Sequence, residues 1–393
     1  SKFYKMKKKI AILGSTGSIG RTTLKIIKKH KKDFAIEILS ANRNFNKICN
    51  QIKESKPKYF VINNKKIFLK VSKKFKKKKV KIINNLQKIN LKKKIDITVA
   101  AIPGIAGLEP TIFLAKRTKK LLIANKESVI CGWNIINKIS RKHNTKIIPL
   151  DSEHFSLYKL TQGFNNSEIE KLYITASGGP FLNLPLNKFK NIRPKDALKH
   201  PKWKMGKKIS IDSSTLMNKI FELIEAQKLF PFDQNKFQII IHPQSLVHAI
   251  VKFKNGLIKF LYHEPDMTIP IANAIFEKNL IVGKLRKERK FNLDNLKFLK
   301  VDKKRFPTIK IIPKLGKYAS TPIILNASNE ILVDEFLKRK ISFKSIFQCL
   351  ELVLRDKNYK KYAIQKPLDL KTIYNIDLWA RNKTIDLLKK KKF

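Results

Sequence analysis

The segment Ile10-Ala-Ile-Leu-Gly14-Ser-Thr-Gly17-Ser-Ile-Gly20 decides the fold of the first part of the chain. Its four apolar residues predict a buried strand, and the apolar positions that follow at Leu24, Ile26 and Ile27 predict a helix. Glycines between them let the backbone turn sharply and approach a pyrophosphate, which a helix N-terminus binds through its N–H groups. The spacing is G-x-x-G-x-x-G and not the usual G-x-G-x-x-G, so a purely structural turn stays open as an alternative.

Further short apolar runs follow, separated by helix-like stretches, at 36–39, 59–62, 95–102, 121–124 and 147–150. Continuous apolar runs of this kind are typical of parallel strands that are covered on both faces. We therefore expect an α/β fold that begins with a Rossmann-like, doubly wound parallel sheet over residues 1–150.

The end of the second predicted strand bears on the cofactor. Proteins that bind NAD usually place Asp or Glu there, to hold the ribose hydroxyls. This chain has Ala41-Asn42-Arg43-Asn44 and no acid. Arg43 could pair with a 2′-phosphate, so the sequence favours NADP over NAD.

Three further regions are expected: an α+β catalytic domain at 151–280, a linker at 281–310 and a helical C-terminal domain at 311–393. In the catalytic domain, strands are predicted at 172–175, 237–241, 246–253 and 257–262. Asn255-Gly256 between the last two predicts a hairpin. The apolar spacing predicts a helix over 214–230, which Pro231 ends.

Candidate metal ligands follow the strand at 147–150. In an extended segment, Asp151 and Glu153 would point to the same side. Glu222, on the predicted helix, offers a third carboxylate. Three carboxylates without His or Cys suit Mg²⁺ or Mn²⁺. The alternative is a capping acid together with ordinary helix-surface acids.

Ligands for a phosphate monoester are also present. Ser177 follows a predicted strand in Ser177-Gly-Gly-Pro180, and Ser213 lies at the expected start of the helix that carries Asn218 and Lys219. A hydroxyl, an amide and an ammonium group at a helix N-terminus can bind phosphate. The segment from His200 to Gly206, with its Trp203 and Met205, could form a lid that excludes water. Ordinary capping and a tryptophan that docks a loop are the alternatives.

The composition restricts the class of protein. The chain has 393 residues and a formal charge of +57, but 75 of its 86 basic residues are lysines. Proteins that recognise nucleic acid favour arginine, so we attribute most of this charge to drift in composition and expect no specific nucleic-acid partner. Three widely spaced cysteines provide no disulfide framework and indicate a reducing, cytoplasmic setting. The longest uncharged apolar stretch, 97–108, is too short to span a membrane.

Together these segments resemble the 1-deoxy-D-xylulose 5-phosphate reductoisomerase family. The resemblance is carried, in order along the chain, by the glycine turn, Gly104-Ile-Ala-Gly-Leu-Glu-Pro110, Ala124-Asn-Lys-Glu-Ser128, Asp151-Ser-Glu-His154, Ser177-Gly-Gly-Pro180, 200–206, Asn218-Lys219 with Glu222, His242-Pro-Gln-Ser245, Glu264-Pro-Asp-Met267 and Leu325-Asn-Ala-Ser-Asn-Glu330. It covers nearly the whole chain.

The resemblance implies a role for each matching residue. NADPH would contact Gly14, Thr16, Gly17, Ser18, Ile19, Asn42, Arg43, Asn44, Asn125, Glu127 and Gly206. The divalent metal (Mg²⁺ or Mn²⁺, with Co²⁺ as a further candidate) would be held by Asp151, Glu153 and Glu222. The phosphorylated sugar would contact Lys126, Ser152, Ser177, His200, Trp203, Met205, Ser213, Asn218, Lys219 and Glu222. The catalytic group would be Asp151, Glu153, Glu222, Lys126 and His200.

The activity implied is the conversion of 1-deoxy-D-xylulose 5-phosphate to 2-C-methyl-D-erythritol 4-phosphate, on the non-mevalonate route to isoprenoids, by a homodimer. The skeleton would rearrange by retro-aldol cleavage and re-addition, and the resulting aldehyde would then take a hydride. Four positions depart from the usual family pattern: Asn42, Phe155, the pair Ile220-Phe221, and Thr268. None of them removes a proposed metal or phosphate ligand.

Two other functions remain open from the sequence. One is another NADP-dependent reductase, such as a semialdehyde dehydrogenase, for which Cys131 would have to be a reactive nucleophile. The other is a basic nucleic-acid-binding protein, although no recognition-helix pattern supports it.

Overall fold

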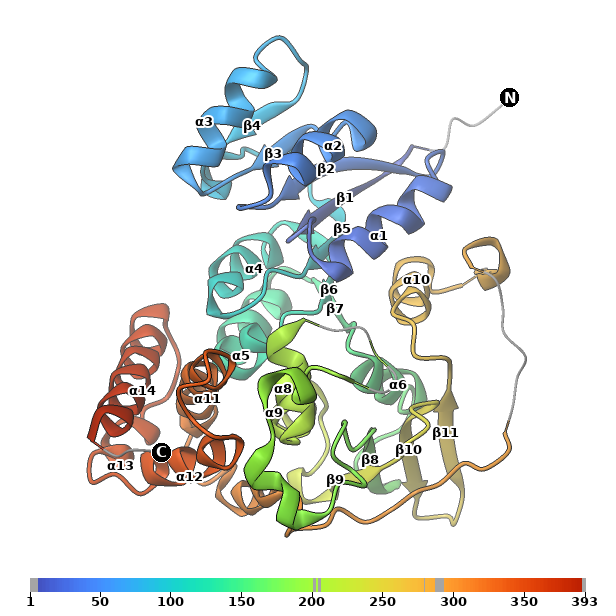
Figure 1. Ribbon diagram of the computed structural model, residues 1–393. Helices are drawn as coiled ribbons and strands as arrows, with labels where there is room; N and C mark the ends of the chain where they lie inside the picture. The colour runs from blue at the N-terminus through green and yellow to red at the C-terminus, as the bar shows by residue number, and fades with distance from the viewer. Residues whose placement is uncertain (1–5, 201–202, 204–205, 279, 287–292, 391–393) are drawn as a thin grey trace. The chain divides into compact units, whose positions relative to one another are not determined.

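The computed structural model describes residues 6–200, 203, 206–278, 280–286 and 293–390 (Figure 1). The chain forms two compact units. Unit 1 takes its described residues from 1–128, 134–155 and 267–291, and unit 2 from 129–133, 156–266 and 292–393.

Unit 1 is built on a sheet of parallel strands in the order β4-β3-β2-β1-β5-β6-β7. The strands are β1 (Lys8–Leu13), β2 (Phe34–Ser40), β3 (Tyr59–Val61), β4 (Lys81–Ile83), β5 (Ile95–Ala100), β6 (Thr118–Ile123) and β7 (Lys146–Pro149). The helices between them are α1 (Ser18–Lys29), α2 (Phe45–Ser55), α3 (Lys65–Lys74), α4 (Leu108–Ala115) and α5 (Lys126–Lys142). The strand order reverses between β1 and β5, so the predicted Rossmann-like sheet is confirmed.

The predicted strands match because their runs are buried: Ile10, Ile12, Ile38 and Val99 are fully enclosed. The sequence did not predict β4, which is a three-residue edge strand that begins with a lysine and follows a lysine-rich stretch. A late helix, α10 (Thr268–Phe276), also belongs to unit 1 and packs on α1. Glu277 just after it pairs with Lys120 and Lys146. Burial raises the pKa of Glu277, but its two lysine partners outweigh that effect and hold the pKa at about 2.

Unit 2 contains a mixed sheet in the order β11-β10-β8-β9. Its strands are β8 (Ile169–Ala176), β9 (Phe237–Ile241), β10 (Val247–Phe253) and β11 (Ile258–Tyr262). Only β8 and β9 are parallel, and β10 and β11 form the hairpin predicted at Asn255-Gly256. Gly256 has φ +87°, which the turn requires and which glycine adopts without strain.

The helices between residues 152 and 229 are α6 (Ser152–Leu160), α7 (Pro194–Ala197), α8 (Lys207–Ser214) and α9 (Met217–Leu229). The C-terminal helices, coloured orange to red in Figure 1, are α11 (Thr321–Leu337), α12 (Phe343–Leu354), α13 (Tyr359–Ala363) and α14 (Leu370–Lys390). α11 packs against α12 and α14 on one side and against α8 and α9 on the other. The predicted helical C-terminal region is confirmed. Among the described residues, no helix has the length and apolar character needed to cross a membrane.

Candidate active site

The glycine turn joins β1 to α1 in unit 1, as predicted. Gly14 has φ +79°, and a Cβ at this position would lie 2.4 Å from the carbonyl oxygen of Ala101, just after β5. A Cβ on Gly20 would lie equally close to the carbonyl oxygen of Gly14. No side chain caps the N-terminus of α1 at Gly17. The turn therefore offers backbone N–H groups at the reversal of strand order, where open α/β sheets bind nucleotides.

The loop after β2 is shaped by its two asparagines. The side-chain oxygen of Asn42 accepts a hydrogen bond from the N–H of Asn63 at 2.7 Å, and Asn44 caps α2 by accepting from the N–H of Lys47 at 2.9 Å. Arg43 lies between them and is exposed. Asn42 thus has a local structural partner, and the role of Arg43 toward a 2′-phosphate stays a prediction.

Asn125 links the end of β6 to the loop after β5. Its side-chain oxygen accepts from the N–H of Ser128 at 2.6 Å, and its amide nitrogen donates to the carbonyl of Gly104 and to the carboxylate of Glu127, both at 3.1 Å. Both Asn125 and Glu127 are buried. They form a fixed wall at the same end of the sheet as the glycine turn.

The start of α5 and the end of β7 meet in an ion pair. Lys126 Nζ lies 2.5 Å from Asp151 Oδ2, and both side chains are largely shielded from solvent. Next to Asp151, the hydroxyl of Ser152 donates to Glu153 at 2.6 Å. Unit 1 thus gathers two carboxylates, a hydroxyl and an ammonium group where β7 ends.

The predicted extended conformation of 151–153 is wrong, because α6 already begins at Ser152. The carbonyl of Asp151 accepts from the N–H of Phe155 at 2.7 Å, which is the first hydrogen bond of that helix. Aspartate favours the position before a helix, where its negative charge faces the positive end of the helix dipole. Asp151 and Glu153 are therefore a helix-start residue and a first-turn residue.

In unit 2, Glu222 lies on α9 with two nitrogen groups from the same helix. Asn218 Nδ2 donates to its carboxylate at 2.6 Å, and Lys219 Nζ pairs with the other oxygen. Glu222 is 2 % exposed and Lys219 is 7 % exposed. A carboxylate buried to this degree needs a positive partner.

The expected position of Ser213 is wrong. It lies near the end of a separate helix, α8, and not at the start of the helix that carries Glu222. Leu216 separates the two helices with φ +63°, in the left-handed region. The apolar spacing continues through this elbow because Leu216 and Met217 are both buried, and this continuity led to the prediction of a single helix.

Three of the residues predicted to contact the phosphorylated sugar, Ser177, His200 and Lys219, lie near one another in unit 2. His200 Nε2 lies 3.0 Å from Ser177 Oγ, and the N–H of Trp203 donates to His200 Nδ1 at 2.8 Å. The hydrogen of the neutral imidazole is therefore on Nε2, where it faces Ser177. Burial, together with the charge of Lys219, lowers the pKa of His200 to about 4.

Gly179 brings the Ser177 loop against α8. Its φ is +65°, and a Cβ there would lie 2.9 Å from the carbonyl oxygen of Ser213. Ser177 and Ser213 thus lie on two backbone segments that are in direct contact. Of the predicted lid, 200–206, the structure describes His200, Trp203 and Gly206, whereas Met205 lies outside the described residues. The ring of Trp203 packs edge-on against His248.

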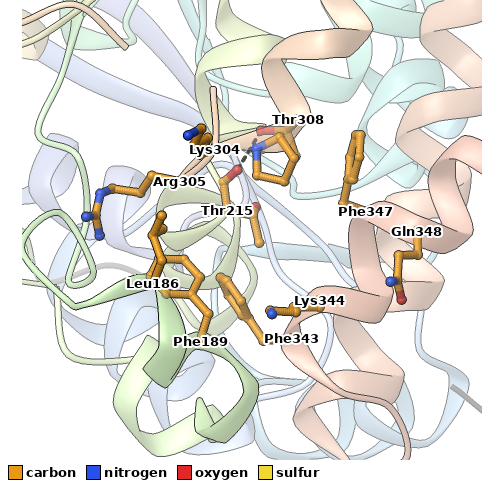
Figure 2. Close-up of a pocket in the computed structure, with 11 residues that line it drawn as sticks. Leu186, Phe189, Thr215, Lys304, Arg305, Thr308, Phe343, Lys344, Phe347 and Gln348 are labelled. Carbon is orange, nitrogen blue, oxygen red and sulfur yellow. Dashed lines mark hydrogen bonds between the residues drawn. The ribbon is translucent and has the colours of Figure 1, made fainter. Parts of the chain in front are cut away.

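A pocket elsewhere in unit 2 contains none of the predicted site residues. Figure 2 shows it between the segment that follows β8, the segment around Thr308 and α12, with Phe189, Phe343 and Phe347 among its lining. It touches the elbow only through Thr215, whose carbonyl accepts from the hydroxyl of Thr308 at 2.7 Å. The pocket therefore borders the elbow at Thr215, and its lining contains no predicted catalytic residue.

Two buried residues of unit 2 received no role from the sequence. Gly179 permits the contact just described, and Asp212 is a charged residue with 2 % exposure. The i, i+4 spacing of Lys208 and Asp212 was the available signal, because it predicts an ion pair on a helix that starts after Gly206. Cys131, the nucleophile of the alternative reductase, is buried with 1 % exposure.

The chain matches families of known proteins over most of its length. Residues 10–132 match the family described as 1-deoxy-D-xylulose 5-phosphate reductoisomerase. Residues 147–230 match its C-terminal domain, and residues 263–383 match the family described as DXP reductoisomerase C-terminal domain.

Individual proteins of the same family also match the chain. The 1-deoxy-D-xylulose 5-phosphate reductoisomerase of Pelagibacter ubique is 46 % identical over 375 residues, which cover 94 % of this chain and 97 % of that protein. That of a Wolbachia strain from Brugia malayi is 37 % identical and covers 98 % of each chain.

Solved structures agree as well. A DOX-P reductoisomerase in complex with NADPH, fosmidomycin and magnesium is 34 % identical with a TM-score of 0.90, and covers 98 % of this chain and all of that one. The enzyme from Zymomonas mobilis in complex with NADPH is 31 % identical with a TM-score of 0.87, over 98 % of this chain and 99 % of that one. The chain therefore belongs to the 1-deoxy-D-xylulose 5-phosphate reductoisomerase family.

Proposed function

We propose that the protein converts 1-deoxy-D-xylulose 5-phosphate to 2-C-methyl-D-erythritol 4-phosphate. The carbon skeleton rearranges to a branched aldehyde, which takes a hydride from NADPH and a proton to give the alcohol and NADP⁺. The observation that carries the proposal is the grouping of Ser177, neutral His200 and Lys219 in unit 2, which suits the phosphate of the substrate.

The glycine turn and the loop after β2 support NADPH as the reductant. The N-terminus of α1 suits the pyrophosphate, and exposed Arg43 suits the additional phosphate of NADPH over NADH. Asn125, Glu127 and Gly206 complete the proposed contacts. NADPH, when bound, supplies the hydride, and Asn125 and Glu127 are both buried and held in place by hydrogen bonds.

A divalent cation is held, in this proposal, by Asp151, Glu153 and Glu222. The donor set fits, because hard oxygen ligands without His or Cys suit Mg²⁺, Mn²⁺ or Co²⁺. In the structure, Lys126 pairs with Asp151 and Lys219 pairs with Glu222, so both carboxylates are placed where they hold a positive charge. The ion, when bound, supplies Lewis-acid polarisation of substrate oxygens.

The chain's own polar groups orient the substrate. Ser177 and Ser213 offer hydroxyls to the phosphate, Lys219 offers positive charge, and His200 donates from Nε2 without carrying a charge of its own. Lys126, Ser152 and Asn218 are proposed to hold the hydroxyl and carbonyl oxygens. Trp203 and Met205 belong to the proposed lid. Binding the phosphate away from the reacting carbons fixes the fragments in the geometry that recombination requires.

We also propose that the protein is a homodimer. β11 is an edge strand of the sheet of unit 2, and Leu257, Ile258 and Phe260 on or next to it are exposed. An apolar edge of this kind is a pairing surface. Sedimentation should therefore show a dimer that Phe260→Lys weakens, and a wild-type monomer at micromolar concentration would contradict this proposal. None of the three cysteines forms a disulfide, which suits the cytoplasm.

The decisive experiment follows NADPH absorbance with deoxyxylulose phosphate and Mn²⁺. Metal-dependent oxidation is expected, and its absence with folded protein would exclude the proposed reaction. Glu222→Gln should lose turnover by about 10³-fold or more while its affinity for NADPH stays unchanged. Glu170→Gln is the control, since Glu170 pairs with Lys252 at an exposed position and should leave both quantities unchanged.

A further inference from the structure

A buried polar contact joins the C-terminal helices to the phosphate region of unit 2. Asn329 on α11 donates from Nδ2 to Asp212 on α8 at 2.7 Å, across 117 positions of sequence. The other oxygen of Asp212 accepts from Lys208 at 2.9 Å. Asn329 is fully buried and Asp212 is 2 % exposed, so solvent does not compete with this contact.

The surroundings of Asn329 make this contact unusual. Most of the buried positions of α11 are apolar, among them Ile323, Ile324 and Leu332. Within the described part of the chain, the side-chain oxygen of Asn329 has no hydrogen-bond partner, and neither polar atom of Asn326 one turn earlier has one. Unsatisfied buried polar atoms destabilise a folded protein. Apolar residues would stabilise this interface better, so stability does not account for an amide at this position.

Asp212 connects this contact to the proposed phosphate region. Asp212 directly precedes Ser213 on α8, so holding the carboxylate fixes the rotation of α8 and the direction of Ser213. Lys208 also lies 5.3 Å from the ring centre of Phe221 on α9, next to Glu222. The contact thus spans α11, α8 and α9, and these last two helices carry Ser213, Asn218, Lys219 and Glu222.

We propose that Asn329 is a positioning residue for substrate binding: through Asp212 it sets the orientation of α8 and so presents Ser213 to the phosphate. This inference rests on the proposed function. It assigns the C-terminal helices a part in recognition of the substrate, although no residue of α11 belongs to the proposed site. Asp212 is not among the proposed contacts of NADPH, and Gly206, which is one of them, lies at the start of α8, away from Asp212 in its second half. A change at Asn329 is therefore expected to affect substrate more than NADPH.

The test uses the full-length protein and two variants. In Asn329→Asp, a second carboxylate of nearly the same shape faces Asp212, and the KM for the phosphorylated substrate should rise about tenfold. The KM for NADPH should change less than about twofold. In the exchange Asp212→Asn with Asn329→Asp, amide and carboxylate trade places, and the KM for substrate should return to within about threefold of wild type.

Glu330→Gln is the matched control on the same helix. Glu330 pairs with Arg381 of α14 at 2.6 Å, so this change should lower Tm without moving the ratio of the two KM values. If Asn329→Asp does not fold, Asn329→Ala replaces it and should raise the KM for substrate about threefold. Equal changes in both KM values, or no change in a folded variant, would overturn the proposal, as would an exchange variant that recovers nothing.

A binding measurement separates this proposal from the proposed function. Calorimetric titration with inorganic phosphate reports on the phosphate region without any turnover. Weaker phosphate binding by Asn329→Asp, restored in the exchange variant, supports the positioning role even if the wild type does not reduce deoxyxylulose phosphate. Identical phosphate affinities in wild type and Asn329→Asp would contradict it.

Discussion

The glycine turn of unit 1 and the α8–α9 elbow of unit 2 are both proposed to present polar groups to an anionic ligand, yet they are held in different ways. The turn lies between a strand and the helix that directly follows it. A Cβ added at Gly20 would lie nearest to atoms of the turn itself, and one added at Gly14 would lie nearest to Ala101 after β5. The elbow depends on distant segments: Gly179 contacts Ser213, and Thr308 holds Thr215. The first arrangement is nearly complete in the local sequence, whereas the second exists only after several parts of the chain have packed.

The largest expected effect follows from Gly14→Ala. The new Cβ would lie 2.4 Å from the carbonyl oxygen of Ala101, and the φ of +79° is unfavourable for alanine. Because the obstacle is backbone, β1 and the segment after β5 must move apart where the cofactor is proposed to bind. We expect the Kd for NADPH, measured by fluorescence titration, to rise about 100-fold or more.

Gly163→Ala is the control for backbone strain alone. Gly163 has φ +84°, but a Cβ there would meet no atom within 4 Å. It should cost about 1–2 kcal/mol of stability and leave the affinity for NADPH unchanged. An equal loss of affinity in both variants would show that the contact with Ala101 is not what shapes the cofactor site.

A smaller effect is expected from Gly179→Ala at the elbow. The new Cβ would lie 2.9 Å from the carbonyl oxygen of Ser213 and would push the Ser177 loop away from α8. The KM for the phosphorylated substrate should rise about tenfold, with affinity for NADPH unchanged. Gly14→Ala is thus expected to weaken the binding of NADPH, and Gly179→Ala to weaken the binding of the substrate.

Gly178→Ala is the matched control within the same loop. Gly178 also has positive φ, but its Cβ would meet only the side chain of Leu182, which can adjust. Its effect on KM should be clearly smaller than that of Gly179→Ala. If both variants weaken substrate binding equally, strain in the loop and not its contact with α8 governs the site.

The same contrast explains what the sequence could predict. Buried runs such as Ile10–Leu13, and the Asn255-Gly256 hairpin, produce patterns that local physics determines. The fold class, the glycine turn and the predicted strands can therefore be predicted from the sequence. The helix break at Leu216 cannot, because a leucine in the left-handed region is stable only when tertiary packing holds it there. The extended conformation predicted for 151–153 is wrong for a local reason: Asp151 favours the position before a helix, and the helix begins directly after it.

The smallest expected effect concerns His200 and pH. The pKa of His200 is lowered to about 4, so the folded protein keeps it neutral while an unfolded chain takes up a proton near pH 6.5. Between these two values the unfolded state binds more protons, and stability must fall as the pH decreases from about 6.5 to about 4. His200→Gln keeps a neutral polar side chain and removes this proton uptake. The decline in Tm over that range should be smaller in the variant than in the wild type, whereas above pH 7 the difference in Tm should not depend on pH. Parallel Tm curves of the wild type and the variant from pH 7 to pH 4 would mean that His200 titrates normally. The neutral donor that is proposed beside the elbow would then be a cation at mildly acidic pH. The backbone donors of the glycine turn, in contrast, do not titrate.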